Sequence, residues 1–172
     1  MGITIPIPEP LASELENWRA SFGDPMATLV PPHITLVTTT PSPGWDLTLD
    51  HARAVAASQP EFTVSLSSTG SFRPVSPVVF LRVEEGFDTC VELHSQLQSG
   101  PLERDLDFPF HPHVTVAHDV SEASMDSAEA KLSSFTASFT VRTLGVYEHD
   151  ASGLWKLREE LNLGAVVATA SS

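Results

Sequence analysis

Hydrophobic and polar positions along the chain follow two periods, which predict helices and strands in alternation. In four segments apolar residues recur every three or four positions, as in an amphipathic helix. The expected helices cover residues 10–22, 47–59, 87–97 and 122–135. In the segments between them apolar and polar residues alternate, as in half-buried strands. The expected strands cover residues 3–7, 33–40, 62–66, 77–83, 113–118, 139–148 and 154–161.

The order of these elements favours an α+β fold. Several neighbouring strands are joined by short turns, such as one near Gly70, rather than by helices, which indicates mainly antiparallel pairing. The first strand contains Pro6, which cannot donate a ladder hydrogen bond, so we expect this strand at a sheet edge. A helix followed by a Pro-His strand occurs in each half of the chain, which predicts two similar lobes around a cleft. We expect a single domain over residues 1–163 and a disordered tail over residues 164–172.

Composition limits the class of protein and its partners. The 172 residues include one cysteine, Cys90, which we expect to be an unreactive thiol in the reducing cytoplasm. No window reaches the roughly 18 apolar residues that a membrane span needs, and no signal peptide is evident, so no membrane partner is expected. Nine Lys and Arg against 22 Asp and Glu give a net charge of −13, which disfavours long nucleic acids as partners. We expect the chain to act as a monomer.

One pentapeptide pattern, Pro-His-aliphatic-Thr-aliphatic, occurs twice, at residues 32–36 and 112–116. This composition would produce the pattern about 0.002 times by chance. In a strand, side chains two residues apart share a face, so His33 and Thr35 face one way, as do His113 and Thr115. The aliphatic residues between them face the core. A lone strand histidine is more often structural, but the doubled pattern makes these four residues our candidate catalytic and binding set.

If the two motif strands lie side by side, their two imidazoles and two hydroxyls converge, and such a set suits transfer at phosphorus. Imidazoles have an ordinary pKa near 6.5, so one can accept a proton while the other donates one near neutral pH. Threonine hydroxyls can hold the non-bridging oxygens of a phosphate. This chemistry requires no metal and no other cofactor.

On these motifs the sequence resembles the 2H phosphoesterases, and within them the bacterial 2′-5′ RNA ligase and cyclic phosphodiesterase-like group. The resemblance implies a bilobal α+β fold, with two mainly antiparallel sheets flanked by helices around a central cleft of pseudo-twofold symmetry. It implies that His33 and His113 are the acid/base pair and that Thr35 and Thr115 bind phosphate. The implied reaction is metal-independent hydrolysis of 2′,3′-cyclic or 2′-5′ phosphodiester bonds, reversible as 2′-5′ ligation. The acidic charge favours a small nucleotide or a short RNA end as substrate.

Further residues are weaker candidates for substrate binding. If one face of the 77–83 strand looks into the cleft, Phe80 could stack on a base and Arg82 could pair with phosphate. A solvent-facing arginine on an edge strand is an equally good interpretation. Other basic and aromatic residues could contact substrate or merely pack: Arg73, Tyr147, Trp155, Lys156 and Arg158.

Two other functions stay open. Gathered around Zn²⁺, His33, His111, His113 and His118 could form a metal site, although this leaves both threonines unexplained. Many members of the resembled group have a basic residue soon after the second motif, where this chain has Val116-Ala117-His118. Regular alternation turns His118 to the core-facing side of its strand, unless the strand bulges. A catalytically idle nucleotide-binding module is therefore the second alternative.

Overall fold

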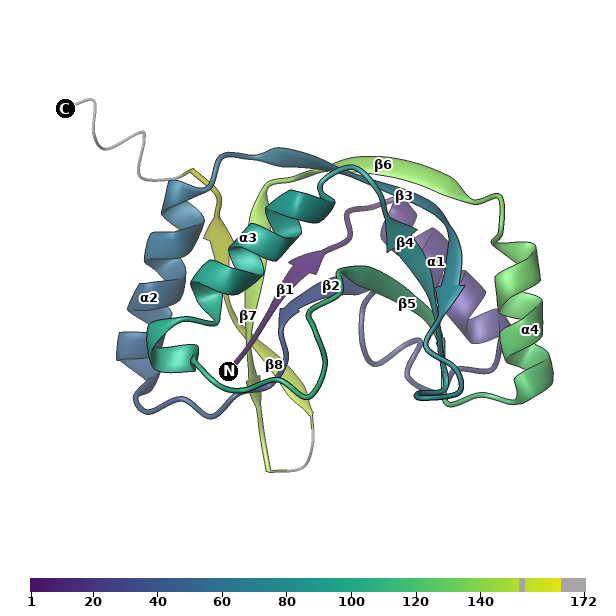
Figure 1. The fold of residues 1–172 in the computed structure, drawn as a ribbon, viewed down its shortest axis with the longest axis horizontal. Helices are drawn as coiled ribbons and strands as arrows, with labels where there is room; N and C mark the ends of the chain where they lie inside the picture. The colour runs from purple at the N-terminus through teal and green to yellow at the C-terminus, as the bar shows by residue number, and fades with distance from the viewer. Residues whose placement is uncertain (152–153, 165–172) are drawn as a thin grey trace.

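The computed structural model describes residues 1–151 and 154–164. Over these residues the chain forms strands and helices in alternation (Figure 1). The strands are β1 (Gly2–Pro6), β2 (His33–Val37), β3 (Phe62–Ser71), β4 (Val78–Val83), β5 (His113–His118), β6 (Thr136–Val141), β7 (Thr143–His149) and β8 (Trp155–Asn162). The helices are α1 (Leu11–Ser21), α2 (Trp45–Ser58), α3 (Phe87–Leu97), the short 3₁₀ helix η1 (Gly100–Leu102) and α4 (Glu122–Lys131).

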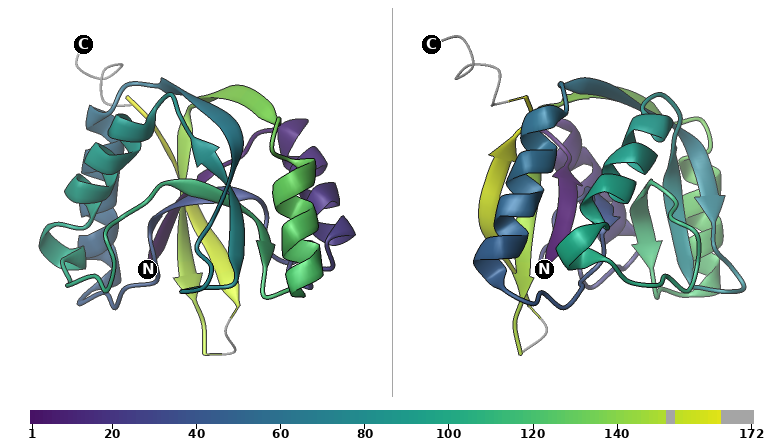
Figure 2. Two further views of the ribbon diagram at one scale, coloured as in Figure 1. Left: turned by 45° about the vertical axis from the view of Figure 1, so that its right-hand side comes forward. Right: turned by 60° about the vertical axis from the view of Figure 1, so that its left-hand side comes forward.

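All the strands form one sheet in the order β6-β3-β4-β5-β2-β1-β7-β8, with antiparallel neighbours throughout. The order is symmetric about the boundary between β5 and β2. On the two sides of that boundary β4 matches β1, β3 matches β7, and β6 matches β8. The topology is therefore pseudo-twofold, and it brings the two motif strands together at the centre of the sheet. Figures 1 and 2 show α2 and α4 at opposite ends of the molecule.

Two helices hold the central strands in place. α1 precedes β2 along the chain but packs against β5, and α3 precedes β5 but packs against β2. Leu15 of α1 and Leu93 of α3 are fully buried in these contacts with the core. Burying one leucine side chain contributes about 1.5–3 kcal/mol. Because each helix covers the strand of the other half, packing fixes the alignment of β2 with β5.

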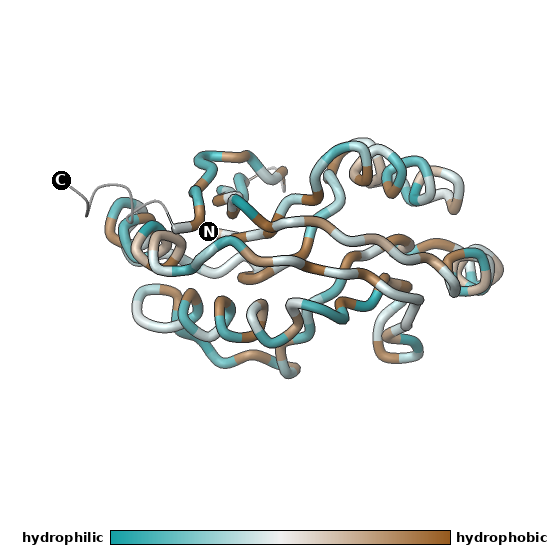
Figure 3. Tube along the Cα trace, turned by 90° about the horizontal axis from the view of Figure 1, so that it is seen from above, coloured by the Kyte–Doolittle hydropathy of each residue, from teal (hydrophilic) through white to brown (hydrophobic). Residues whose placement is uncertain are grey.

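The hydrophobic core is contiguous and runs from Met1 to Leu163. Figure 3 shows hydrophobic and polar positions interspersed along the strands. Ile34 and Val114, which face each other across β2 and β5, are fully buried. Since neighbouring side chains of a strand point to opposite faces, His33 and His113 lie on the other face and are only partly buried.

The α+β class with antiparallel pairing is confirmed, but three details differ from the expectations. The halves share one continuous sheet instead of forming two, because β2 pairs with β5 through Ile34 and Val114. β1 is not an edge strand, since it pairs with both β2 and β7. Pro6 is tolerated because β7 pairs only with residues 2–4 of β1, so Pro6 lies beyond that ladder.

The third difference concerns the strands expected at 62–66 and 139–148. The first continues through Gly70 to Ser71, so the turn to β4 lies at residues 72–77. The second is two strands that part at Arg142. β6 pairs with β3 and β7 pairs with β1, so these two consecutive strands lie in opposite halves of the sheet.

Three further expectations concern the C-terminal tail, the Cys90 thiol and membrane-spanning helices. The Gly164 amide donates a hydrogen bond of 3.0 Å to the Ala56 carbonyl, and the rest of the tail expected over 164–172 lies outside the described residues. Burial raises the pKa of Cys90 to about 12, as expected of an unreactive thiol. Within residues 1–151 and 154–164, no helix combines the length and the apolar character needed to cross a bilayer.

Candidate active site

His33 and His113 each begin a motif strand, and the pairing of these strands brings them together. In an antiparallel pair, the residues on either side of Ile34 and Val114 are also neighbours. The register therefore sets His33 beside Thr115 and Thr35 beside His113, so that each histidine adjoins the threonine of the other motif. The Nε2 atom of His33 also lies 3.1 Å from the Thr35 hydroxyl. The four predicted side chains thus share one face of the sheet.

Both imidazoles are held by the same kind of backbone hydrogen bond. Nδ1 of His33 is 2.7 Å from the carbonyl oxygen of Pro31, and Nδ1 of His113 is 2.7 Å from that of His111. A carbonyl oxygen can only accept, so each Nδ1 carries the proton. In the neutral ring Nε2 then carries the lone pair, which in His33 can accept a hydrogen bond from the Thr35 hydroxyl. Each histidine is positioned as a proton acceptor that becomes a donor once it is protonated.

Burial keeps both rings neutral. Desolvation lowers the pKa of His33, and the charge of Arg19 lowers it further, against the opposing effect of the Pro31 carbonyl. Desolvation lowers the pKa of His113 to about 4; the hydrogen bond to the His111 carbonyl opposes this shift, and the charges of the His111 and His33 rings add to it. Because an anionic phosphate favours the imidazolium form, a bound substrate would raise these pKa values again.

Aromatic rings pack around each histidine. The rings of Phe72 and Phe80 lie 5.0 and 5.2 Å from His113, centroid to centroid. On the other side, Trp155 lies 6.3 Å from His33 and 5.5 Å from Tyr147. These rings remove water from around the imidazoles, which is the cause of the lowered pKa values.

The motif strands also share an irregularity that the sequence did not predict. Thr4 pairs with Thr35 and Ile3 with Val37, so Leu36 is an extra residue, a β-bulge, in β2. Phe80 pairs with Thr115 and Val79 with Ala117, which leaves Val116 as the matching bulge in β5. A bulge reverses the alternation of side chains that follow it. Both strands therefore turn the third residue after the motif threonine out of the core.

His118 is the residue that this bulge turns outward in β5. It is exposed, and it does not face the core as regular alternation would require. The equivalent residue of β2 is Thr38, which is also exposed. No group of three or more His, Cys, Asp or Glu side chains among the described residues is arranged to hold a metal ion. The His111 ring instead packs edge-on against Phe72 and Phe80.

A cavity of about 740 Å³ adjoins the His113 side of the site. Its walls come from the ends of β2 and β3, from α3, and from the loops at 72–77 and 103–112. Thr35 and His113 line it, as do exposed apolar side chains of the two loops, Val75 and Phe108. The volume and the largely apolar walls are typical of a site for a small organic ligand.

The weaker sequence candidates on β4 lie beside His113. Phe80 is buried, and its ring contacts the imidazole, so it forms the floor of the site and is not an exposed stacking surface. Arg82 is exposed and is the cross-strand partner of His113. Desolvation lowers the pKa of His111, and the charge of Arg82 lowers it further. Among the described residues Arg82 has no carboxylate within ion-pair distance, so its guanidinium is available to an anion.

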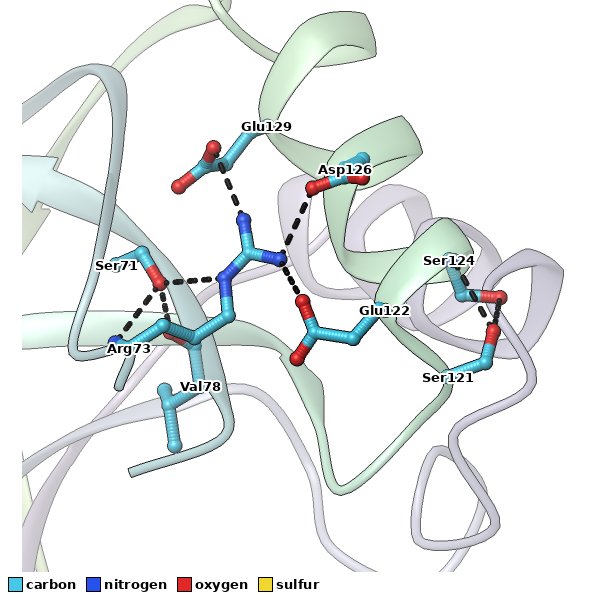
Figure 4. Close-up of polar contacts among 8 residues, drawn as sticks. All are labelled: Ser71, Arg73, Val78, Ser121, Glu122, Ser124, Asp126 and Glu129. Atoms are coloured by element: carbon cyan, nitrogen blue, oxygen red, sulfur yellow. Dashed lines mark hydrogen bonds and ion pairs between the residues drawn. The ribbon is translucent and has the colours of Figure 1, made fainter. Parts of the chain in front are cut away.

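Arg73 does not belong to this set, in contrast to the sequence expectation. Figure 4 shows its guanidinium turned toward α4. Nη1 lies 2.9 Å from Glu122 and 3.0 Å from Asp126, and Nη2 lies 3.2 Å from Glu129. These carboxylates occupy positions i, i+4 and i+7 of the helix and so lie along one face. Arg73 ties the loop after β3 to α4, and its charge is already compensated.

The remaining candidates lie around the His33 side or away from the site. The Tyr147 ring packs on Trp155, and burial raises the pKa of Tyr147, so its hydroxyl stays protonated at neutral pH. Arg158 forms an ion pair of 3.4 Å with Glu148 and lies over the Trp45 ring. Lys156 is exposed on β8.

Sequence reasoning missed several residues of the cavity wall, of which His94 and Arg104 are the most informative. His94 lies on α3, and its Nδ1 donates a 2.7 Å hydrogen bond to the carbonyl of the bulged Leu36. Its ring stacks on Phe110 with the centroids 4.0 Å apart. Arg104 stands in an acidic loop that gave no sequence signal, and its Nη2 donates a 3.0 Å hydrogen bond to the Thr38 hydroxyl.

Gly70 provides a test of how tightly the floor of the site is packed. A Cβ at this position would lie 2.7 and 2.8 Å from two ring atoms of Phe80, which contacts His113. We expect Gly70→Ala to lower the free energy of unfolding by about 1–3 kcal/mol, because the ring must move. Turnover should fall as well, since the ring supports His113. Denaturant titration and a kinetic assay would measure both.

Gly44→Ala is the matched control, because the nearest atom to its added Cβ is 4.0 Å away. Gly44 is the N-cap of α2, where alanine is a poor cap, so we expect a loss of at most about 1 kcal/mol and unchanged turnover. A Gly70→Ala variant that matches wild type in both stability and turnover would contradict the packing argument.

The chain is similar to known sequences along most of its length. The sequence model of the 2′-5′ RNA ligase superfamily matches residues 7–153. The chain is 27% identical to a protein of Bacillus cytotoxicus named as a candidate phosphoesterase, over 95% of this chain and 96% of that protein. Similarly named proteins of Bacillus thuringiensis and Bacillus mycoides are 26% identical with the same coverage.

Solved structures have the same fold. E. coli LigT in complex with NADP⁺ has a TM-score of 0.66 and 23% identity, covering 95% of this chain and 96% of LigT. LigT in complex with 3′-AMP has a TM-score of 0.64 and 24% identity, covering 94% and 96%. A protein of Thermus thermophilus has a TM-score of 0.64 and 20% identity, covering 95% and 98%. At these identities the likeness establishes the fold alone.

Proposed function

The chain belongs to the 2′-5′ RNA ligase superfamily, as its two motifs predicted, and we propose that it is a phosphoesterase that cleaves 2′,3′-cyclic or 2′-5′ phosphodiester bonds. The arrangement of the two imidazoles supports this function most strongly. His33 and His113 stand on adjacent strands, and each is fixed through Nδ1 to a backbone carbonyl. Their two Nε2 atoms can therefore serve opposite sides of one phosphorus atom.

The reaction needs one proton acceptor and one proton donor. For a 2′,3′-cyclic phosphate, the neutral histidine removes a proton from water while the water oxygen forms a bond to phosphorus. The bond from phosphorus to one ribose oxygen breaks, and the protonated histidine gives its proton to that oxygen. The product is a phosphomonoester with a neighbouring hydroxyl. For a 2′-5′ bond, the neighbouring 3′-hydroxyl or water is the nucleophile, and the reverse sequence joins two ends.

The side chains around the histidines are suited to the charge of this reaction. The hydroxyls of Thr35 and Thr115 can donate hydrogen bonds to the non-bridging oxygens, where negative charge develops in the transition state. Arg82, the cross-strand neighbour of His113, can add a charge-assisted hydrogen bond. All protons that move are carried by side chains and water, so the proposed steps use no metal ion.

We propose small nucleotides or short RNA ends as substrates. The net charge of −13 opposes the binding of a long polyanion, whose affinity depends on many basic contacts. The cavity of about 740 Å³ is large enough for a nucleotide. Structures of the related LigT hold small nucleotides, namely 3′-AMP, NADP⁺ and ATP, which supports the same class of ligand for this chain.

Product formation from a panel of substrates tests the proposal. The panel contains 2′,3′-cyclic nucleotides, a 2′-5′ dinucleotide and ADP-ribose cyclic phosphate, each assayed with EDTA present for wild type and His113→Ala. We expect wild-type turnover of at least one substrate that survives EDTA and is lost in the variant. Binding without turnover on the whole panel would overturn the proposal in favour of a nucleotide-binding module. Activity that disappears only with EDTA would overturn it in favour of a metal site.

A further inference from the structure

Arg104 brings a guanidinium to the cavity beside the proposed catalytic histidines. It lies in the loop between η1 and β5 and is one of the residues that line the cavity. Its Nη2 donates a 3.0 Å hydrogen bond to the hydroxyl of Thr38, which also lines the cavity. A guanidinium has five N–H donors, so this single contact leaves most of them available.

The charge of Arg104 is not compensated by the acidic residues around it. Glu103, Asp105 and Asp107 are close in sequence, and Asp107 also lines the cavity. Even so, no carboxylate in the part of the chain that the structure describes lies within 4.0 Å of the guanidinium. Most other arginines are paired, as are Arg19, Arg53, Arg73, Arg142 and Arg158. In a chain with a net charge of −13, an unpaired arginine in a cavity indicates a site for an anion.

The β2 bulge determines which way Thr38 points, and so where Arg104 is held. Thr35 is in the proposed phosphate site, and Thr38 is three residues further along the same strand. The bulge at Leu36 turns Thr38 out of the core, where it can hold Arg104. At about 3.3 Å per residue, shortened by the bulge, the two threonines are about 7–10 Å apart. The ribose of a nucleotide phosphorylated at both ends can bridge such a span.

We propose that Arg104 and Thr38 form a second anion subsite, which binds a phosphate of the substrate other than the one that reacts. This inference rests on the proposed function, because it takes the reacting phosphate to lie at His33 and His113. The ligand class is then a nucleotide with an additional phosphate, such as a 5′-phosphorylated nucleoside with a cyclic phosphate at its other end. Guanidinium suits this role because its planar fork matches the oxygens of a phosphate.

Arg82 and Arg104, which have no ion pair among the described residues, then bind different phosphates of the substrate. Arg82 lies next to His113 on β4 and serves the reacting phosphate. Arg104 lies across the cavity on a loop and serves the additional phosphate. Asp107, at the cavity wall, opposes anion binding and limits the contribution of the subsite.

Calorimetric binding of two product-like probes tests the inference. The probes are 3′-AMP and adenosine 3′,5′-bisphosphate, which differ only in the 5′-phosphate. For wild type we expect the bisphosphate to bind about tenfold more tightly than 3′-AMP. This factor corresponds to the lower end of the range for a hydrogen bond between charged groups, because the site is open to solvent. In Arg104→Gln the ratio of the two dissociation constants should fall to about one, and Arg104→Lys should retain part of it.

Arg142→Gln is the matched control, because it removes the same charge from an exposed residue whose only ion pair in the described chain is 3.9 Å long, with Glu61. It should keep the tenfold ratio and the turnover of wild type. A wild-type ratio near one, or a tenfold ratio that survives in Arg104→Gln, would overturn the subsite. The ratio is measured without catalysis, so a failure of the proposed function would appear separately, as absent turnover with an intact ratio.

Discussion

Replacing either motif histidine with alanine is expected to lower kcat by about 10²–10⁴-fold while the protein remains folded. Each substitution removes one of the two proton transfers, which contributes a factor of this size. The imidazoles of His33 and His113 are only partly buried, and each makes one backbone hydrogen bond, so their loss leaves the hydrophobic core intact. Steady-state kinetics on the substrate identified by the panel, with denaturant titration of each variant, measures both quantities.

His51→Ala is the matched control for this prediction. The Nε2 atom of His51 lies 3.1 and 3.2 Å from the carbonyl oxygens of Gln96 and Leu97, so this histidine also joins two segments of the fold. It takes no part in the proposed site, and its removal should lower stability without a change in kcat. In the proposed reaction His33 and His113 act on one phosphorus atom, so the double alanine variant should be little slower than either single variant. A motif variant that loses activity only in proportion to its loss of folded protein would contradict the catalytic role.

Local sequence patterns correctly predicted the ends of one helix and one strand that begin next to a glycine or a proline. The helix at 87–97 and the strand at 113–118 were predicted with the bounds that the structure has. Gly86 precedes that helix with a φ of 84°, which favours glycine, and Pro112, whose ring fixes φ, precedes that strand. Each element therefore begins just after a residue with special backbone properties. The doubled pentapeptide likewise predicted four side chains on one face, because the period of two in a strand is a property of the backbone itself.

Features that depend on pairing across the sheet could not be predicted in this way. We expected one strand over residues 139–148, yet the segment divides at Arg142, because β6 pairs with β3 and β7 pairs with β1. The bulges at Leu36 and Val116 are defined only by the strands beside them. These bulges bring Thr38 to the cavity and turn His118 outward. The position of β1 inside the sheet has the same origin, since it depends on β7, which lies far along the chain.

The partners of Arg73 could have been recognised from the sequence, whereas the position of Arg104 could not. Glu122, Asp126 and Glu129 have the i, i+4, i+7 spacing of one helix face, so a strong acidic partner for a nearby arginine was present in the sequence. Nothing in the sequence indicates that Arg104 turns away from its three acidic neighbours. Its position depends on Thr38, which is distant along the chain and is exposed by a bulge.

The second large effect concerns pH, because kcat/KM for a phosphodiester substrate is expected to fall by about 100-fold between pH 6.5 and pH 8.5. In the proposed mechanism the active free enzyme carries one proton shared between His33 and His113, and the pair titrates in two macroscopic steps. Burial lowers the pKa of both rings below the ordinary 6.5, and that of His113 to about 4. Above the higher step the doubly neutral form dominates, so the active fraction falls tenfold with each pH unit. The optimum of kcat/KM therefore lies on the acid side of pH 6.5.

The charged neighbours of the two rings act in the same direction. His111 faces His113 from the preceding turn, Arg82 faces it from β4, and Arg19 of α1 acts on His33. All are cationic or become cationic as the pH falls, and each disfavours the protonated form of the histidine beside it. A phosphodiester keeps its single negative charge from pH 4 to pH 9, so the profile reports the protein alone. A rate that is flat or rises between pH 6.5 and pH 8.5 would contradict the assignment of one protonated histidine.

Binding of an unreactive ligand separates this proton from the chemical step. 2′-Deoxyadenosine 3′-(methyl phosphate) carries one charge and lacks the 2′-hydroxyl, and calorimetry in buffers of different ionisation enthalpy counts the protons that its binding takes up. Because the anion raises the pKa of a histidine beside it, the complex should take up close to one proton at pH 6.5, and the dissociation constant should rise by up to tenfold per pH unit above that. His33→Asn and His113→Asn each leave one imidazole, and the variant that loses the proton uptake identifies the donor. No proton uptake in wild type would mean that the phosphate is not bound between the two rings, whatever the rate profile.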